Sequence, residues 1–406
     1  MTRVTRDRAA APESFVMRAY RNVALAAGAF GLLSIAVGAP RAEPAQPEPD
    51  PPVLETEGPA EPSGPAPRGA ANELIEWTMH RSADGQHPNG VEQAFIWLMN
   101  RARHDPSAEG AFLRTVDDPL VDRARSFFRV DLGLLQDEFD AFDPAPPSAF
   151  DARLYEAARA HSLDLIDRDA QDHAGQFARV DAAGFHYRGG RGSVFSYTKT
   201  ALYGHAAFNI DWGGNDGTGM QNPPGHRLAI MLDYPNVGLA AVSTGGAALD
   251  VGPLVVTANY MVADARRADH HNRFLVGTVW EDLDHNERFD PGEGLEGVEV
   301  LPDRGPYYAV TSAGGGFAVP ALSEGLYRIT FSGSALGAPR NRTAFVGQES
   351  VLVDLRLPEP GAGASTVAAL LVLGLLATRR RAPHTASSTA RSAGSADLAA
   401  CSRCVP

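Results

Sequence analysis

A run of twelve residues, Asp282 to Glu293, constrains the fold of this chain more than any other stretch. Its oxygen-bearing side chains follow positions 1, 3, 5, 9 and 12 of an EF-hand calcium loop, and position 7 of such a loop ligates through its backbone carbonyl. Oxygen ligands in this number suit Ca²⁺. The spacing therefore predicts a calcium site made by Asp282, Asp284, Asn286, Arg288, Asp290 and Glu293.

The residues around this loop do not fit a helix–loop–helix setting. Position 6 holds Glu287, where the sharp turn of an EF-hand uses glycine. The stretches Thr278–Trp280 and Gly297–Leu301 have the composition of strands, and apolar Phe289 at position 8 is a candidate anchor. The alternative is an acidic surface loop that holds no ion. Further strand-like runs predict a small all-β sandwich, Ig-like or prealbumin-like, over residues 277–357: Ala309–Ser312, Phe317–Val319, Tyr327–Phe331 and Val351–Leu355.

Apolar residues at helical spacing precede this β region. From Val91 to Ala102 they recur on one face, which predicts a helix that ends before Pro106. A second helix is expected to begin at Asp151, a good N-cap residue. Its apolar stripe includes His161, which we interpret as a hydrogen-bonded core histidine rather than a site residue.

The next part of the chain combines a less regular helix with strands. We expect the helix over Tyr197–Trp212 and the strands over Val237–Val242 and Leu254–Met261. Helices first and strands last predict an α+β domain over residues 72–263. Within it, Tyr203–Met231 joins a Gly/Asn/Asp-rich loop to a Pro-Pro-Gly-His-Arg turn, and such loops on a rigid scaffold often carry function.

Four segments of this domain, in order, resemble the CAP superfamily of cysteine-rich secretory, antigen 5 and pathogenesis-related proteins, in its bacterial secreted (SCP-like) branch. They are LMNRARHDPSAEG from Leu98, LYEAARAHSLDLIDRDAQDHAG from Leu154, AGFHYRGGRGSVFSY from Ala183, and the stretch with GHAAFNIDWG and PGHRLAIM, followed by VGLAAV. The resemblance implies an α-β-α sandwich with a central cavity. It also implies two histidines and two acidic residues in that cavity, which hold a divalent cation in some members.

By position, the two cavity histidines of the resemblance fall on His173 and His226. The Glu-Asn pair of the family falls on Gly192-Ser193, so one acidic residue is absent. His205, Asp211 or Asp216 are candidates to replace it. Two imidazoles with a carboxylate form an open site for Zn²⁺ or another divalent ion; the alternative is a pair of hydrogen-bonded histidines that brace the cavity wall.

The sequence gives no support for a serine hydrolase. Ser193 and Ser196 lie near the expected turn, but no G-x-S-x-G nucleophile elbow is present. The resemblance to the CAP superfamily implies a binding protein rather than an enzyme, with a small ligand or a protein partner in the cavity. The alternatives are a metal-dependent or serine-type hydrolase and a structural matrix component with a degenerate cavity.

The chain ends indicate export. Residues 1–42 have the charged start, apolar Val23–Val37 run and small-residue exit of a signal peptide, and residues 43–71 form a Pro-rich acidic linker. Residues 264–276 are expected to be a second linker. A Pro-Glu-Pro motif, an apolar run and three arginines over residues 358–381 resemble a PEP-CTERM sorting signal, which implies a transmembrane segment and an exosortase-type processing enzyme. We expect residues 382–406, with Cys401 and Cys404, to be a disordered tail.

These features place the expected protein at the cell envelope or outside it. The net charge of −13 argues against nucleic acid as a partner. The β region is similar to the calcium-binding B-type repeats of bacterial surface adhesins, in which calcium stiffens a stalk. We therefore expect an envelope-attached protein whose calcium-stabilised β-module acts as a spacer for the ligand-binding domain.

Overall fold

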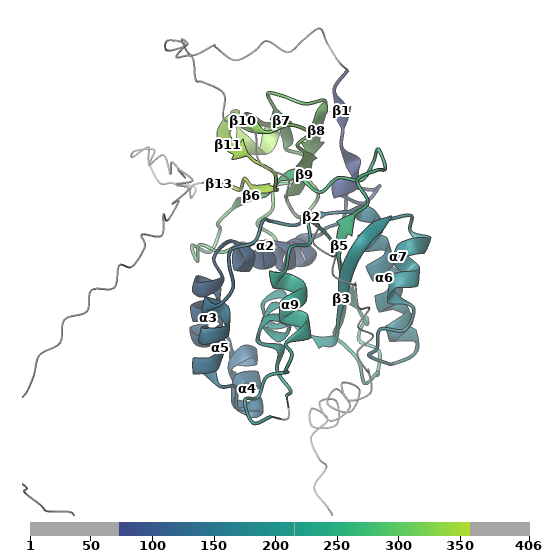
Figure 1. Cartoon of the computed structure of the whole chain (residues 1–406), viewed down its shortest axis with the longest axis vertical. Helices are drawn as coiled ribbons and strands as arrows, with labels where there is room; N and C mark the ends of the chain where they lie inside the picture. Colours follow the sequence, from purple (N-terminus) through teal and green to yellow (C-terminus); the bar gives the residue numbers. More distant parts are fainter. Residues whose placement is uncertain (1–72, 215, 358–406) are drawn as a thin grey trace, which may run out of the picture. The chain divides into compact units, whose positions relative to one another are not determined.

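The computed structural model describes residues 73–214 and 216–357, and its elements are labelled in Figure 1. The expected signal peptide, Pro-rich linker, sorting segment and C-terminal tail with Cys401 and Cys404 lie outside the described residues. Within the described ranges, no helix is long and apolar enough to cross a membrane. The fold combines helices with mixed sheets, as the predicted α+β class requires.

Aspartate and asparagine caps start the first four long helices. Asn89 forms a capping box with Glu92, and Asp105, Asp118 and Asp131 each accept backbone N–H bonds at the next helix start. Pro106 follows the end of the first predicted helix and also opens the next one, where its missing N–H costs nothing. The helices are α2 (Gly90–His104), α3 (Pro106–Thr115), α4 (Pro119–Phe128) and α5 (Leu132–Asp140).

The second predicted helix is confirmed. It is α6 (Ala152–Asp167) with Asp151 as its N-cap, and α7 (Gln176–Ala182) follows. His161 on the α6 stripe is fully buried, and its Nε2 lies 2.9 Å from the Asp172 carbonyl. Burial lowers the pKa of His161, so it is a neutral core histidine, as interpreted from the sequence.

The helix predicted over Tyr197–Trp212 is correct only in part. Tyr197 and Thr198 end strand β3 (Tyr187–Thr198), and α8 (Ala201–Ala206) then passes into a π-helical turn, η2 (Ala207–Asp211). Strand β3 was not predicted, because its glycines obscure the strand pattern. Two of them face filled space: a Cβ at Gly190 would meet Met261, and one at Gly192 would meet Gln176. A short helix, α9 (Gly225–Met231), completes the stretch.

A mixed four-stranded sheet holds these helices together. Its order is β2 (Ala149–Phe150), β4 (Asn236–Ser243), β5 (Leu254–Ala263) and β3, with β2 parallel to β4 and the other pairs antiparallel. The two strands predicted for this region are thus confirmed as β4 and β5. Figure 1 shows α6 and α7 on one side of β3 and β5 and α9 on the other. We call residues 90–263 the helical domain.

The second region is entirely strands, apart from one 3-10 turn, η3 (Ser334–Leu336). Five strands form the sheet β1-β8-β7-β10-β11, and β6 pairs with β9, β12 and β13 in another sheet. The apolar core includes residues of both sheets. The strands of this region are β6 (Phe274–Glu281), β7 (Glu299–Pro302), β8 (Tyr307–Val310), β9 (Gly316–Pro320), β10 (Gly325–Ser332), β11 (Arg340–Val346), β12 (Val351–Leu352) and β13 (Leu355–Leu357).

One strand of that region comes from the start of the described chain. Strand β1 (Ile75–Glu76) pairs in parallel with Tyr307–Tyr308 of β8, and a 3-10 turn, η1 (Thr78–His80), leads from it toward α2. We therefore define the β-module as residues 274–357 together with β1. The module begins before the helical domain and is completed after it.

The β-module and the helical domain share a packed boundary. Trp280 and Phe289 of the module belong to the same buried apolar cluster as the helices. The Gln93 amide of α2 donates to Thr278 Oγ1 at 2.7 Å, and the Pro88 carbonyl accepts from Gly314 N at 3.0 Å. The expected linker 264–276 is wrong at its C-terminal end, because β6 already begins at Phe274.

Candidate functional site

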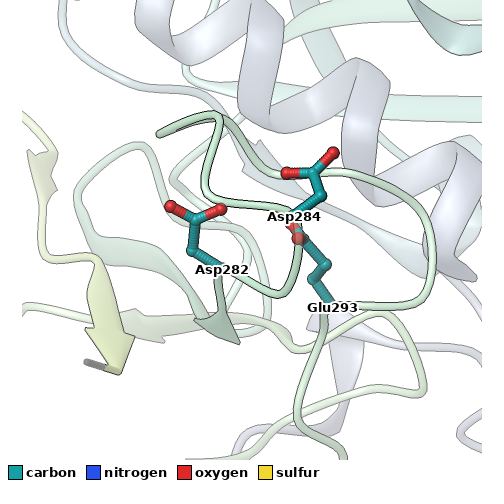
Figure 2. A group of neighbouring side chains, drawn as sticks. All are labelled: Asp282, Asp284 and Glu293. Atoms are coloured by element: carbon teal, nitrogen blue, oxygen red, sulfur yellow. The ribbon is translucent and has the colours of Figure 1, made fainter. Parts of the chain in front are cut away.

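The loop after β6 gathers three carboxylates. Ligand atoms of Asp282, Asp284 and Glu293 lie within 4.8 Å of one another and form a group that can hold a metal ion. Figure 2 shows the Glu293 carboxylate between the other two. Asp282 and Glu293 are buried, whereas Asp284 is exposed. The strand on the N-terminal side of the loop and the absence of a flanking helix agree with the setting predicted from the sequence.

Backbone amides of the loop already point at its carboxylates. Asp282 accepts from Asn286 N at Oδ1 and from Glu287 N at Oδ2, each at 3.2 Å. Glu293 accepts from Leu283 N and Asp290 N, each at 2.8 Å. These bonds hold the acidic side chains in place and offset part of their mutual repulsion.

The turn at position 6 is made without glycine. Glu287 has a φ of 63° and His285 a φ of 65°, both in the left-handed region. For a residue with a Cβ this conformation costs about 1–2 kcal/mol. The Glu287 departure noted in the sequence is therefore accommodated by backbone strain rather than by a different turn.

The side chains of the other three predicted ligands make contacts of their own. The Asn286 amide donates to Asp284 Oδ2 at 2.8 Å and to Asp290 Oδ2 at 2.5 Å, while its Oδ1 accepts from Arg288 N at 2.7 Å. The amide nitrogen of Asn286, not its oxygen, thus faces the carboxylates. The Arg288 guanidinium lies over the Phe112 ring of α3, 5.8 Å from its centroid.

Sequence reasoning missed Arg356. It stands on β13, donates to Asp282 Oδ2, and has Nη1 at 3.6 Å from Glu287 Oε1. Its guanidinium also lies 5.6 Å from the centroid of the Trp280 ring. A lone arginine 74 positions away along the chain has no local signal, because only the parallel pairing of β13 with β6 brings it to the loop.

A second candidate site is a cavity in the helical domain. It has a volume of about 50 Å³ and is bounded by η2, α9 and β3. His226 is a lining residue, whereas His173 and His205 are not. The lining residues are Phe128, Gln171, Val194, Phe195, Ala207, Phe208, Asp211, Trp212, Gly213, Gln221 and His226.

His226 and Asp211 form a carboxylate–imidazole pair in this cavity. Asp211 Oδ1 lies 2.7 Å from His226 Nδ1, and Asp211 Oδ2 accepts from the His226 backbone N–H at 2.9 Å. Burial opposes a charge on His226, but the Asp211 charge and hydrogen bond outweigh it and raise the pKa of His226. The Nε2 atom of His226 has no hydrogen-bond partner in the described part of the chain, and 25% of the side chain is exposed.

The pair depends on an unusual backbone. Asp211 ends the π-helical turn with a φ of 56°, left-handed for a residue with a Cβ, and its side chain is buried. Strained residues and π-helical turns are often found at functional sites. Asp211 was one of three candidates to replace the missing acid, and the structure pairs it with His226.

His173 is fixed by a neutral partner. Its Nδ1 lies 2.7 Å from Gln176 Oε1, and the Gln176 amide donates to the Ala258 carbonyl at 3.1 Å and to Asn259 Oδ1 at 2.9 Å. A Cβ at Gly192 would lie 2.6 Å from Gln176 Nε2, so Gln176 fills the space where an acidic side chain is expected. Partial desolvation, and then the proximity of His226, lower the pKa of His173.

The remaining candidates lie outside the cavity. His205 is buried and pairs with Glu109 of α3 at 2.8 Å, where it joins α8 to α3. Asp216 accepts from Thr218 in an exposed turn. Ser196 donates to the Ala170 carbonyl at 3.2 Å, and Ser193 is fully buried, so neither serine is placed to attack a ligand in the cavity.

No protein-family model matches the chain, and no curated protein matches its sequence.

Proposed function

We propose that the protein is an exported binding protein of the CAP type that holds a small ligand in the cavity at His226. The observation that carries this proposal is the pairing of His226 with buried Asp211, which leaves Nε2 free toward an aromatic-lined cavity. Binding sites of this kind combine apolar walls with a few fixed polar groups. Helices against both faces of a mixed sheet are compatible with the α-β-α sandwich that the CAP type requires.

We also propose that the loop from Asp282 to Glu293 binds Ca²⁺. The supporting observation is the triad of carboxylates, held by backbone amides around one space. Asn286 and Asp290 would complete the oxygen ligands if the Asn286 amide turned over, because its oxygen then faces the triad. The packed boundary with the helical domain favours a rigid base for the cavity over a freely moving spacer.

A metal-dependent activity that involves His226 in the cavity lining and His173 outside that lining is a second candidate. It is favoured by one observation: the Nδ1 atoms of His173 and His226 are both engaged, by Gln176 and Asp211, which leaves both Nε2 atoms free. Partners of this kind orient the histidine ligands of metal sites. Zn²⁺ is the ion that such a nitrogen pair suits best, and a water-activating hydrolase would be the resulting enzyme.

The envelope location remains part of the proposal. It rests on the signal-like residues 1–42 and the sorting-like residues 358–381, with an exosortase-type enzyme as the processing partner. Fractionation of cells that express the full chain tests it, since recovery of the full-length protein in the cytoplasm contradicts export.

The cavity function is tested by a thermal-shift screen of small amphipathic compounds. A ligand that binds only the folded protein raises its stability by RT ln(1 + [L]/Kd). We expect compounds that stabilise the wild type and fail to stabilise His226→Gln. The matched control is His104→Gln, because His104 is exposed and is not among the residues that line the cavity. A screen in which every stabilising compound acts equally on His226→Gln argues against the cavity as the site.

A further inference from the structure

We propose that Asp354 makes the contact between the β-module and the helical domain sensitive to pH, so that the contact is stronger when the carboxyl group is protonated and weaker when it is charged. This inference concerns the boundary between the two parts and does not depend on the cavity at His226. It follows from the position of Asp354 at the boundary, from the small cavity beside it, and from the charges that surround it.

Asp354 lies where the β-module meets helix α2. It stands between β12 and β13, and its Oδ1 accepts from Thr278 N of β6 at 2.8 Å. The Thr278 side chain in turn accepts from the Gln93 amide of α2 at 2.7 Å. The carboxyl group is therefore one step away from a hydrogen bond that joins the two parts, and a change in its charge acts at their boundary.

A cavity of about 10 Å³ lies at this contact, and both parts of the molecule line it. The β-module contributes Asp354 and Thr278, and α2 contributes Trp97 and Asn100. A space of this size admits about one water molecule. The charged form of the Asp354 carboxyl group therefore loses much of its hydration on this side, whereas the neutral form has less hydration to lose.

The hydrogen-bond donors beside Asp354 compensate for this loss only in part. Asp354 is partly buried, and this burial raises its pKa to about 6, against the opposing effect of the N–H groups of Thr278 and Trp97. Trp97 Nε1 is itself buried and has no hydrogen-bond partner among the described residues. Its N–H thus acts on the carboxylate as a nearby dipole and not as a closed hydrogen bond.

The charged groups around the cavity do not offset the charge of Asp354. His80 of η1 is the one other titratable side chain in the described lining, and burial lowers the pKa of His80 to about 4, so it is neutral above that pH. Strands β2, β6, β9 and β12 contribute no charged side chain to that lining. Arg101, whose guanidinium lies over the Trp97 ring, and Arg356 are each paired with an acidic residue elsewhere.

The direction of the effect follows from the raised pKa. An aspartate in an unfolded chain titrates near pH 4, so between about pH 4 and pH 6 the folded protein keeps a proton on Asp354 that the unfolded chain has released. The stability that this proton contributes is fully present below about pH 4 and decreases as the pH rises. It is lost above about pH 6, where Asp354 is charged in both states.

Carbon-13 NMR of the full chain measures the protonation of Asp354 directly. The carboxyl signal of Asp354 is identified by its absence from the spectrum of Asp354→Asn. We expect its midpoint near pH 6, well above that of an ordinary aspartate. Trp97→Phe keeps a ring at the boundary but removes the N–H dipole, and should move this midpoint to a still higher pH.

Urea unfolding between pH 4.5 and pH 8 measures the effect on stability. Asparagine never carries the charge, so Asp354→Asn should raise the folding equilibrium constant above that of the wild type by up to about 100-fold at pH 8 and by much less at pH 4.5. The matched control is Asp117→Asn, because Asp117 is exposed and lies outside the cavity lining. Its difference from the wild type should not follow this pH dependence.

Amide hydrogen exchange shows whether the boundary itself responds. Thr278 N donates to Asp354, and Gly314 N donates across the boundary to the Pro88 carbonyl at 3.0 Å. After correction for the intrinsic exchange rate, both amides should be less protected in the wild type at pH 8 than at pH 5. In Asp354→Asn their protection should be the same at both pH values. The amides of the β4–β5 pair, which lie within the helical domain, should respond less.

Three results overturn the proposal: a carboxyl midpoint near pH 4, a stability difference between Asp354→Asn and the wild type that does not change with pH, or boundary amides whose protection is independent of pH. If Asp354→Asn does not fold, the midpoint in the wild type and its shift in Trp97→Phe decide the question, and a midpoint that Trp97→Phe leaves unchanged contradicts the proposal. None of these results bears on the ligand screen of the cavity at His226, so the two proposals can fail separately.

Discussion

The loop from Asp282 to Glu293 and the cavity in the helical domain both contain acidic side chains, but the charges of those side chains are in opposite states. In the loop, Asp282, Asp284 and Glu293 face one another, and Arg356 is the one arginine that pairs with a member of this triad in the described chain. In the cavity, Asp211 is fully bonded to His226. Carboxylates gathered with little positive charge nearby favour a cation, whereas the charge of a carboxylate that is paired with a histidine is already offset.

Backbone strain appears in both regions and supports this difference. Glu287 and His285 bend the loop so that its amides reach the acids, and Asp211 bends η2 so that its carboxylate reaches His226. A left-handed residue with a Cβ persists only where its surroundings hold it. In the loop, the strained backbone brings negative charges together. In the cavity, it places the Asp211 charge against His226.

The largest expected effect concerns how firmly the loop is joined to the helical domain. Phe289 is 2% exposed within the helical core cluster, so Phe289→Ala should destabilise the whole protein by about 3–5 kcal/mol. Denaturant unfolding followed by tryptophan fluorescence measures it. Phe345→Ala is the control, since that ring is 68% exposed, and it should change stability by less than about 0.5 kcal/mol. If Phe289→Ala and Phe345→Ala changed the stability equally, the Phe289 side chain would not contribute to the core of the helical domain.

The second effect tests whether the gathered charges of the loop bind a cation. Calcium at about 100 times its Kd should stabilise the wild type by about 2.7 kcal/mol, and Asp282→Ala should abolish that gain because Asp282 is the buried member that opens the loop. Differential scanning calorimetry with and without Ca²⁺ measures it. Asp117→Ala, an exposed acid outside the loop, should keep the full gain. If Ca²⁺ does not stabilise the wild type, the loop does not bind this cation, and the loop and the cavity no longer differ in this respect.

The third effect is a pH dependence that arises in the cavity. Because Asp211 raises the folded-state pKa of His226, the pair contributes stability that is fully present below the unfolded pKa and is lost as pH rises through the folded pKa. Asp211→Asn should therefore flatten the stability profile from about pH 6.5 upward, where unperturbed histidine titrates. Urea unfolding across that range, with Asp216→Asn as control, measures it. Identical profiles of the wild type and Asp211→Asn would contradict the pairing.

The smallest effect concerns the strain at position 6 of the loop. Glu287→Gly should stabilise the loop by up to about 1 kcal/mol, because glycine adopts a φ of 63° without steric cost but loses more chain entropy on folding. Glu287→Ala keeps the Cβ and should give no gain. Thermal unfolding of both variants distinguishes relief of strain from loss of the carboxylate, since the latter would stabilise both equally.

Sequence reasoning succeeded where the determining contacts are local. The α6 stripe and its Asp151 cap follow helical spacing, and the triad of the loop follows the ligand spacing. It failed for β3, since Gly190 and Gly192 are explained by their contacts with Met261 and Gln176, which no local pattern reveals. It also left open which acid serves the cavity, because Asp211 reaches His226 through a π-helical turn that no residue pattern specifies.

Because of strand β1, both ends of the described chain lie in the same module. Residues 75–76 pair with β8, and β13 at residues 355–357 pairs with β6, so both ends of the described chain belong to the β-module and the helical domain is an insertion between its parts. A pulling force applied at these two ends would act on the β1–β8 and β13–β6 strand pairs of the β-module. It would not act directly on the inserted helical domain. We expect a protein that is held at these two ends to keep the cavity at His226 undistorted under tension, with the strand pairs of the module bearing the force.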